Sequence, residues 1–84
     1  MSFRYTKHAI YKFDLLKKYR FLISKSLLES IVSNPLKRET RVDGTYIAMA
    51  RYDRTHVLRI VYRVEHDTIV VITFYPGRKK SYEI

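Results

Sequence analysis

The chain has 84 residues and no cysteine, and its formal net charge at pH 7 is +9. This length is typical of one domain with one modest core. The lack of cysteine excludes disulfides and thiolate metal sites. No apolar run approaches the ~20 residues of a membrane span, and the polar, basic start does not resemble a signal peptide. We therefore expect a single soluble, cytoplasmic domain over residues 1–84 that has no membrane partner.

The first predicted helix covers residues 7–19. Residues 3–5 predict a short extended lead-in, and Thr6 is suited to the N-cap position. Apolar side chains then recur at helical spacing among lysines, which is the pattern of an amphipathic helix. Arg20 is expected in its last turn, where a cation faces the negative end of the helix dipole. The apolar residues 21–23 predict a turn under the core.

The second predicted helix starts at Ser24 or Ser26. Ser26 and Glu29 have the spacing of a capping box. Asn34 and Pro35 are expected to end the helix, because the residue before proline tends to leave the helical region. The connection between the two helices is short, so they should form a hairpin that covers one face of a sheet.

Two strands are predicted at the centre of that sheet. Residues 57–64 and 68–75 are rich in Val, Ile and Tyr and flank the polar turn Glu65, His66 and Asp67. Residues 46–52 alternate as a third strand, whereas residues 36–44 predict a loop. Pro76 and Gly77 should end the last strand. The fold class is therefore α+β, with an N-terminal two-helix hairpin packed on a small twisted antiparallel sheet of three to four strands.

Strand alternation assigns the side chains to two faces. If Val64 lies opposite Thr68, one face is apolar and the other carries Arg59 in mid-strand. If Tyr52 also lies opposite Val57, Ala50 lies beside Arg59. The small alanine would then leave a shallow groove bordered by three tyrosines, Tyr46, Tyr52 and Tyr75. The apolar face should comprise Leu58, Ile60, Tyr62, Val70, Ile72 and Phe74.

The charge favours a polyanionic partner, most commonly nucleic acid. Eight tyrosines and four phenylalanines are compatible with stacking on bases, although most of them also suit strands. The three histidines, His8, His56 and His66, are scattered and lack the convergence of a metal site. We expect no metal and no cofactor.

The strongest constellation combines Arg59 with the basic segment that follows the last predicted strand, namely Arg78, Lys79, Lys80 and Tyr82. Metal-free RNA cleavage requires cations for the phosphorane, a base and an acid. An aromatic ring can hold the base. The alternative is that Arg59 pairs with an acidic side chain and that the tail is frayed. The residues alone do not decide between the two.

Residues 58–64, L-R-I-V-Y-R-V, resemble the third-strand signature of RelE-family toxins. The segment D-T-I-V-V-I-T-F-Y-P-G-R-K-K-S-Y is similar to that family's last strand, its glycine-arginine step and its terminal tyrosine. Asn34 and Pro35, followed by a basic stretch and Gly44, and the opening T-K-H-A-I-Y-K-F also resemble RelE-like domains.

The resemblance implies an endoribonuclease that cleaves mRNA, often on the ribosome, and is neutralised by an acidic antitoxin. Arg59 matches the phosphate-binding arginine, Arg78 the arginine after the last strand, and Tyr82 the nucleotide-handling tyrosine. Strand 46–52 lacks the family's proton-transfer lysine, so the base would be His8, Lys79 or Lys80, or activity would be weak or absent. Further RNA contacts are expected from Arg51, Arg54, Arg63, Tyr52 and Tyr75.

Two other functions are compatible with the same residues. One is a non-catalytic basic module that binds RNA or the ribosome. The other is a small interaction protein whose open sheet face binds a partner chain.

Overall fold

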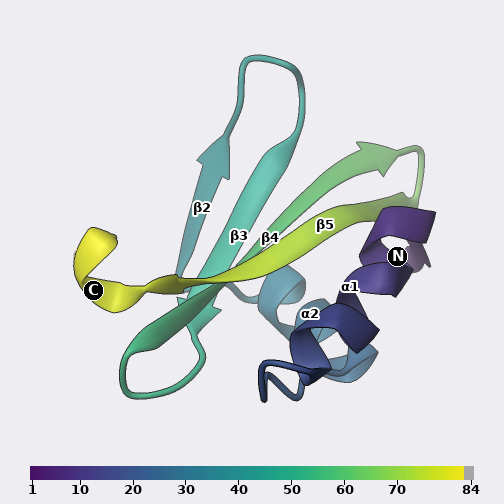
Figure 1. The fold of residues 1–84 in the computed structure, drawn as a ribbon. Helices are drawn as coiled ribbons and strands as arrows, with labels where there is room; N and C mark the ends of the chain where they lie inside the picture. The colour runs from purple at the N-terminus through teal and green to yellow at the C-terminus, as the bar shows by residue number, and fades with distance from the viewer. Residues whose placement is uncertain (83–84) are drawn as a thin grey trace.

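The computed structural model describes residues 1–82, which form a five-stranded mixed sheet with two helices on one face (Figure 1). The spatial order of the strands is β1-β5-β4-β3-β2. In chain order the elements are β1 (Ser2–Tyr5), α1 (Lys7–Lys17), α2 (Lys25–Ser33), β2 (Lys37–Thr40), β3 (Tyr46–Arg51), β4 (His56–Glu65), β5 (Thr68–Arg78) and the short 3₁₀ helix η1 (Lys79–Ser81).

The predicted fold class was wrong in two respects. The chain does not begin with the helix hairpin, because β1 precedes α1 and pairs in parallel with β5. The sheet is therefore mixed and not antiparallel throughout. It is also larger than expected, because residues 37–40 of the predicted loop form β2, which pairs with β3. All four residues of β2 are exposed, so this edge strand lacks the apolar alternation on which strand prediction depends.

Thr6 joins β1 to α1 and fixes where the helix starts. Its hydroxyl accepts a hydrogen bond from the backbone N–H of Ala9 (3.1 Å) and donates one to the carbonyl of Ile72 in β5 (2.8 Å). The predicted N-cap is thus confirmed. The helix ends at Lys17, earlier than expected, and Arg20 lies beyond it in the left-handed region (φ 69°). Arg20 therefore reverses the chain and does not form the last turn.

A β-bulge in β5 changes which of its side chains reach the helices. Glu65, not Val64, lies opposite Thr68, and the register shifts between Val61 and Tyr62, so that Ile72 is an extra residue. A bulge reverses the alternation of side chains along a strand. Ile69, Val71 and Phe74 therefore face the helices, whereas Val70 lies opposite Arg63 on the other face. The predicted apolar face was wrong for Val70 and Ile72.

The core lies between the helices and the sheet, and buried apolar side chains of both helices and of the three central strands form it. They are Ala9, Leu16, Leu28, Ile31, Val32, Ala48, Leu58, Ile60, Tyr62, Ile69, Val71 and Phe74. Phe21 and Ile23 pack against this core from the connection between the helices, as predicted, whereas Leu22 between them is exposed. Within residues 1–82, neither helix is long and apolar enough to cross a membrane.

The start of α2 gives a first test of the structure. Ser24, and not Ser26, is the N-cap, because its hydroxyl accepts a hydrogen bond from the N–H of Leu27 (3.1 Å). Loss of an N-cap serine costs about 1 kcal/mol. We expect Ser24→Ala to lower the free energy of unfolding by about that amount, whereas Ser26→Ala at an exposed position inside the helix changes it little. Urea denaturation measures both, and a larger loss for Ser26→Ala would contradict this assignment.

Candidate functional site

Arg59 lies on the sheet face that carries no helix, between Met49 of β3 and Tyr75 of β5. The predicted neighbour Ala50 was wrong by one residue, because Arg51, and not Tyr52, lies opposite Val57. A shift of one residue moves every side chain of a strand to the other face. The shallow groove expected from a small residue beside Arg59 is therefore absent from the described residues, and methionine fills that position.

Two of the three tyrosines expected at Arg59 lie on the helix side of the sheet. Tyr46 stacks on Tyr62 with a centroid distance of 5.4 Å. The Tyr52 hydroxyl accepts a hydrogen bond from the backbone N–H of Leu22 (3.0 Å). Only Tyr75 remains beside the arginine, and Tyr52 is not placed to contact a ligand bound there.

The guanidinium of Arg59 is buried, with 7% of the residue exposed, and is held by groups from separate strands. Its Nε donates to the Tyr75 hydroxyl (3.1 Å), and its Nη1 donates to Oε2 of Glu39 in β2 (2.8 Å). Burial opposes the charge, but the hydrogen bonds to Tyr75 and Glu39 outweigh it and raise the pKa of Arg59. Of the alternative prediction, the part in which Arg59 pairs with an acidic side chain is confirmed.

The segment after the last strand folds back onto Arg59. β5 continues through Pro76 and Gly77 to Arg78, so the predicted end of the strand was wrong. The N–H of Lys79 then donates to the carbonyl of Thr55 (2.9 Å). The ring centroid of Tyr82 lies 4.4 Å from the guanidinium carbon of Arg59. This cation–π contact shows that the tail is folded over the arginine and not frayed.

Gly77 leaves the space that the Tyr82 ring occupies. A Cβ atom added at Gly77 would lie 2.5 Å from Cε2 of Tyr82, and real Cβ atoms essentially never come that close to another heavy atom. Any larger residue at this position therefore pushes the ring away from Arg59. In the glycine-arginine step noted in the sequence, the glycine is thus the residue that makes room for the Tyr82 ring.

Arg59, Glu39 and Tyr82 line an open hollow of about 440 Å³, the candidate site. The other lining side chains are Lys37, Met49, Lys80 and Ser81. Among residues 1–82, no hydrogen bond is made by Nη2 of Arg59 or by Oε1 of Glu39. The hollow combines three cations with one carboxylate.

The structure brings only some of the predicted site residues to this hollow. Arg59, Lys80 and Tyr82 line it, and Tyr75 contacts Arg59. Arg63 shares the same sheet face but pairs with Glu65 near the β4–β5 turn. Arg51 is exposed at the end of β3.

Three further predicted residues lie beside the hollow and a fourth lies far from it. Arg54, Arg78 and Lys79 line a separate, adjacent depression. His8 is exposed on α1, on the other side of the sheet from Arg59. His8 therefore cannot serve as the base for a substrate bound at Arg59.

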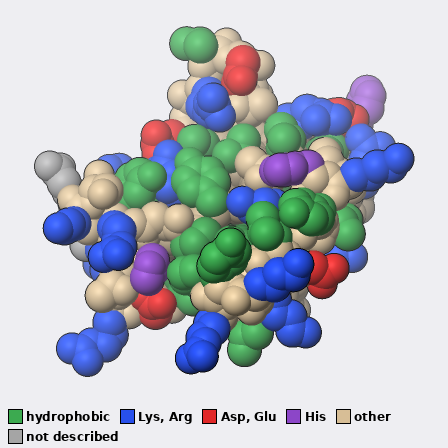
Figure 2. Space-filling view, in the orientation of Figure 1, with side chains coloured by type: hydrophobic (Ala, Val, Ile, Leu, Met, Phe, Trp, Pro, Cys, Tyr) green, Lys and Arg blue, Asp and Glu red, His purple; other side chains and the backbone are tan. Residues whose placement is uncertain are grey.

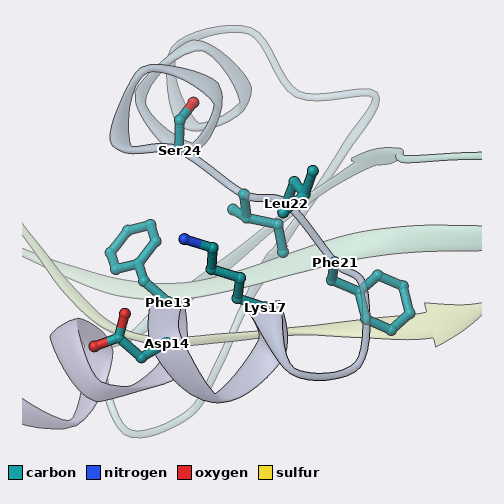
Figure 3. Close-up of a pocket in the computed structure, with 7 residues that line it drawn as sticks. Phe13, Asp14, Lys17, Phe21, Leu22 and Ser24 are labelled. Carbon is teal, nitrogen blue, oxygen red and sulfur yellow. The ribbon is translucent and has the colours of Figure 1, made fainter.

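The helix side of the molecule has its own hollow, of about 330 Å³, between α1 and the segment leading to α2 (Figure 3). Phe13, Phe21 and Leu22 line it together with Asp14 and Lys17. Figure 2 shows apolar side chains gathered near the centre of one face, with lysines and arginines projecting around the edge. None of the predicted site residues lines this hollow, so the candidate site is the one at Arg59.

Three lining residues of the hollow, Glu39, Lys37 and Ser81, were not predicted from the sequence. Lys37 and Glu39 are two residues apart in β2, so their side chains point to the same face of the sheet. The charged run K-R-E-T could have indicated an edge strand. Edge strands often carry charged side chains, because these prevent the strand from pairing with another chain. Ser81 precedes Tyr82 in the tail and carried no signal of its own.

Gly77→Ala tests how the tail is held. The added methyl group should displace the Tyr82 ring from Arg59, because its Cβ position is 2.5 Å from that ring. We expect the nuclear Overhauser contacts between Tyr82 and Arg59 to disappear and trypsin cleavage after Arg78 to accelerate. Gly44→Ala is the matched control, since Gly44 has open space around it and its positive φ (86°) affects only backbone strain. Unchanged Tyr82 contacts in Gly77→Ala would contradict the packing described.

No protein-family model, curated protein or solved structure gives a significant match to the chain, so the chemistry of the hollow itself must support the functional conclusion.

Proposed function

We propose that the chain is a metal-independent endoribonuclease, the toxin of a toxin–antitoxin pair, and that it acts at the hollow around Glu39 and Arg59. The observation that supports this best is the 2.8 Å contact between a carboxylate and a buried guanidinium at an opening that two lysines and Tyr82 also line. A carboxylate beside several cations supplies the groups that cleavage of RNA without a metal requires.

Glu39 is the general base in this proposal, replacing the candidates His8, Lys79 and Lys80. Its Oε2 is held by Arg59, and about half of its side chain is exposed. Oε1 can accept the proton of a ribose 2′-hydroxyl, which then attacks the adjacent phosphorus. The contact with Arg59 fixes the orientation of the carboxylate, and a base must be oriented before its basicity matters.

The cations stabilise the charge that develops on the phosphorane. The guanidinium of Arg59 and the ammonium groups of Lys37 and Lys80, whose residues line the hollow, supply the positive charge. As the bond from phosphorus to the 5′ oxygen breaks, one of the two ammonium groups donates a proton to the leaving oxygen. The products are a 2′,3′-cyclic phosphate and a 5′-hydroxyl, so no water or metal enters this step.

Non-catalytic binding of RNA or the ribosome is the second candidate. One observation favours it: Arg59 is 7% exposed and its charge is already paired with Glu39. A phosphate could then be held by Nη2 and the lysines without being cleaved. The two candidates differ in whether Glu39 moves a proton, and this can be measured directly.

Glu39→Gln tests the catalytic proposal. Glutamine retains the size and one acceptor oxygen, but it cannot act as a base, so cleavage of single-stranded RNA should fall roughly 100-fold or more, the range for loss of a general base. Glu65→Gln is the matched control, because Glu65 also pairs with arginines but lies at the β4–β5 turn. Both variants should bind 2′-O-methyl RNA like the wild type.

Cleavage by Glu39→Gln at the wild-type rate would contradict the role of Glu39. Wild-type protein that binds RNA and never cleaves it would support the second candidate. Comparing the two variants with the wild type in one cleavage assay and one binding assay therefore distinguishes the proposals.

The toxin proposal also predicts a partner. An antitoxin that covers the hollow and the basic tail should be acidic, and its binding should depend on salt. Co-expression with an acidic protein encoded next to this chain should raise the melting temperature, because a ligand specific for the folded state stabilises it. It should also suppress RNA cleavage. Reversing the charges of Arg78, Lys79 and Lys80 should weaken the complex, mainly at low salt. Harmless over-expression and no acidic neighbour would favour the RNA-binding candidate.

A further inference from the structure

We infer a second phosphate-binding site next to the hollow, formed by Arg54, Arg78 and Lys79, which holds a neighbouring phosphate of the same RNA strand. The inference rests on the proposed function, because it concerns how that RNA substrate is held. It assigns Arg78 and Lys79 to binding and not to the chemical step.

The site is a depression of about 260 Å³ where the β3–β4 loop meets the end of β5. Its lining consists of Arg54, Thr55, Arg78, Lys79 and Lys80. The hydrogen bond from the Lys79 N–H to the Thr55 carbonyl (2.9 Å) joins the tail to the loop. His56 and Arg78 are register partners at the ends of β4 and β5. The cations thus converge on a connected backbone and do not project from separate flexible segments.

Among the described residues, no carboxylate balances the charge of this depression. Four of its five lining residues are cationic, and no carboxylate lines it. The nearest acidic residue in sequence, Asp53, is already engaged. It accepts hydrogen bonds from the backbone N–H groups of Thr55 (2.9 Å) and His56 (2.7 Å) and contacts the His56 ring. Among residues 1–82 none of the four cations forms an ion pair.

Phosphate is the ligand class that fits such a site best. Arginine presents planar, paired donors that match phosphate oxygens, and lysine adds a point charge. A single RNA strand carries its phosphates in series, so a protein that holds one phosphate at Arg59 can hold another one close by. Carboxylates match the same donors, so the choice of phosphate rests on the RNA proposed to bind in the adjoining hollow.

Lys80 connects the two sites, because it lines both the hollow at Arg59 and the depression at Arg78. An RNA strand that binds at Arg59 can therefore continue past Lys80 into the depression beside Arg54 and Arg78. The consequence is a dependence on substrate length. A dinucleotide with a single phosphate uses only the hollow, whereas a longer strand uses both sites.

The test compares Arg54→Glu/Arg78→Glu with Lys7→Glu/Arg20→Glu, a control with the same change in charge at exposed positions in and after α1. Binding of a 2′-O-methyl hexanucleotide should weaken roughly tenfold or more beyond the control, the scale of lost charge-assisted contacts. The plot of the logarithm of the binding constant against the logarithm of the salt concentration should be less steep for the double variant than for the control, by about one to two in slope. Cleavage of the hexanucleotide should show a raised KM, while cleavage of a dinucleoside monophosphate should match the control.

The outcomes separate this inference from the proposed function. If the wild type cleaves RNA but the double variant and its control bind the hexanucleotide equally, the second site does not exist and the nuclease proposal stands. If no protein cleaves RNA but the double variant alone loses hexanucleotide binding, the site exists and the nuclease proposal is wrong. Equal loss of dinucleotide and hexanucleotide cleavage beyond the control would place Arg54 and Arg78 in the chemical step and overturn the inference. Circular dichroism confirms that each variant is folded.

Discussion

The buried charge of Arg59 is the constraint on which the helix-free face of this protein depends. Placing an unpaired charge away from water is costly, and here each surrounding segment contributes to its compensation. Glu39 of β2 supplies the counter-charge, Tyr75 of β5 a hydrogen bond, and Tyr82 of the tail a ring face. Ion pairs of this kind are weak evidence for stability, since apolar residues often replace them without loss. The pair lines an open hollow, where Nη2 of Arg59 and Oε1 of Glu39 make no hydrogen bond to residues 1–82.

The sequence predicted the elements that depend on local patterns and missed those that depend on long-range pairing. The two central strands, the Thr6 cap and the end of α2 near Pro35 follow from composition, capping chemistry and proline geometry. The parallel pairing of β1 with β5 has no local signal, because its partners are more than 60 residues apart. The bulge at Ile72 is equally invisible, since a run of Val and Ile looks the same whichever face each residue occupies. This one extra residue reversed the predicted faces of half a strand.

The candidate site shows the same division. A mid-strand arginine and a basic tail with a tyrosine could be recognised in the sequence, and the structure brings Arg59, Lys80 and Tyr82 together. The partner of Arg59 could not be recognised, because Glu39 lies on a strand of exposed residues that predicts a loop. The register between β3 and β4 also decided which side chains surround Arg59. It differs by one residue from the predicted register, so Met49 takes the place of the expected alanine beside Arg59, and Tyr52 lies on the helix side. Sequence patterns identify chemically capable residues, but pairing registers decide which of them meet.

In the proposed reaction, a 2′-hydroxyl of the RNA attacks the neighbouring phosphorus at the hollow, without a metal. The ends of the RNA fragments that the purified wild-type protein produces in the presence of EDTA identify this reaction. We expect fragments that end in a 2′,3′-cyclic phosphate, whose partners begin with a 5′-hydroxyl, and no cleavage where the ribose carries a 2′-O-methyl group. Fragments that begin with a 5′-phosphate, cleavage that EDTA abolishes, or cleavage at 2′-O-methyl positions would contradict the proposed reaction.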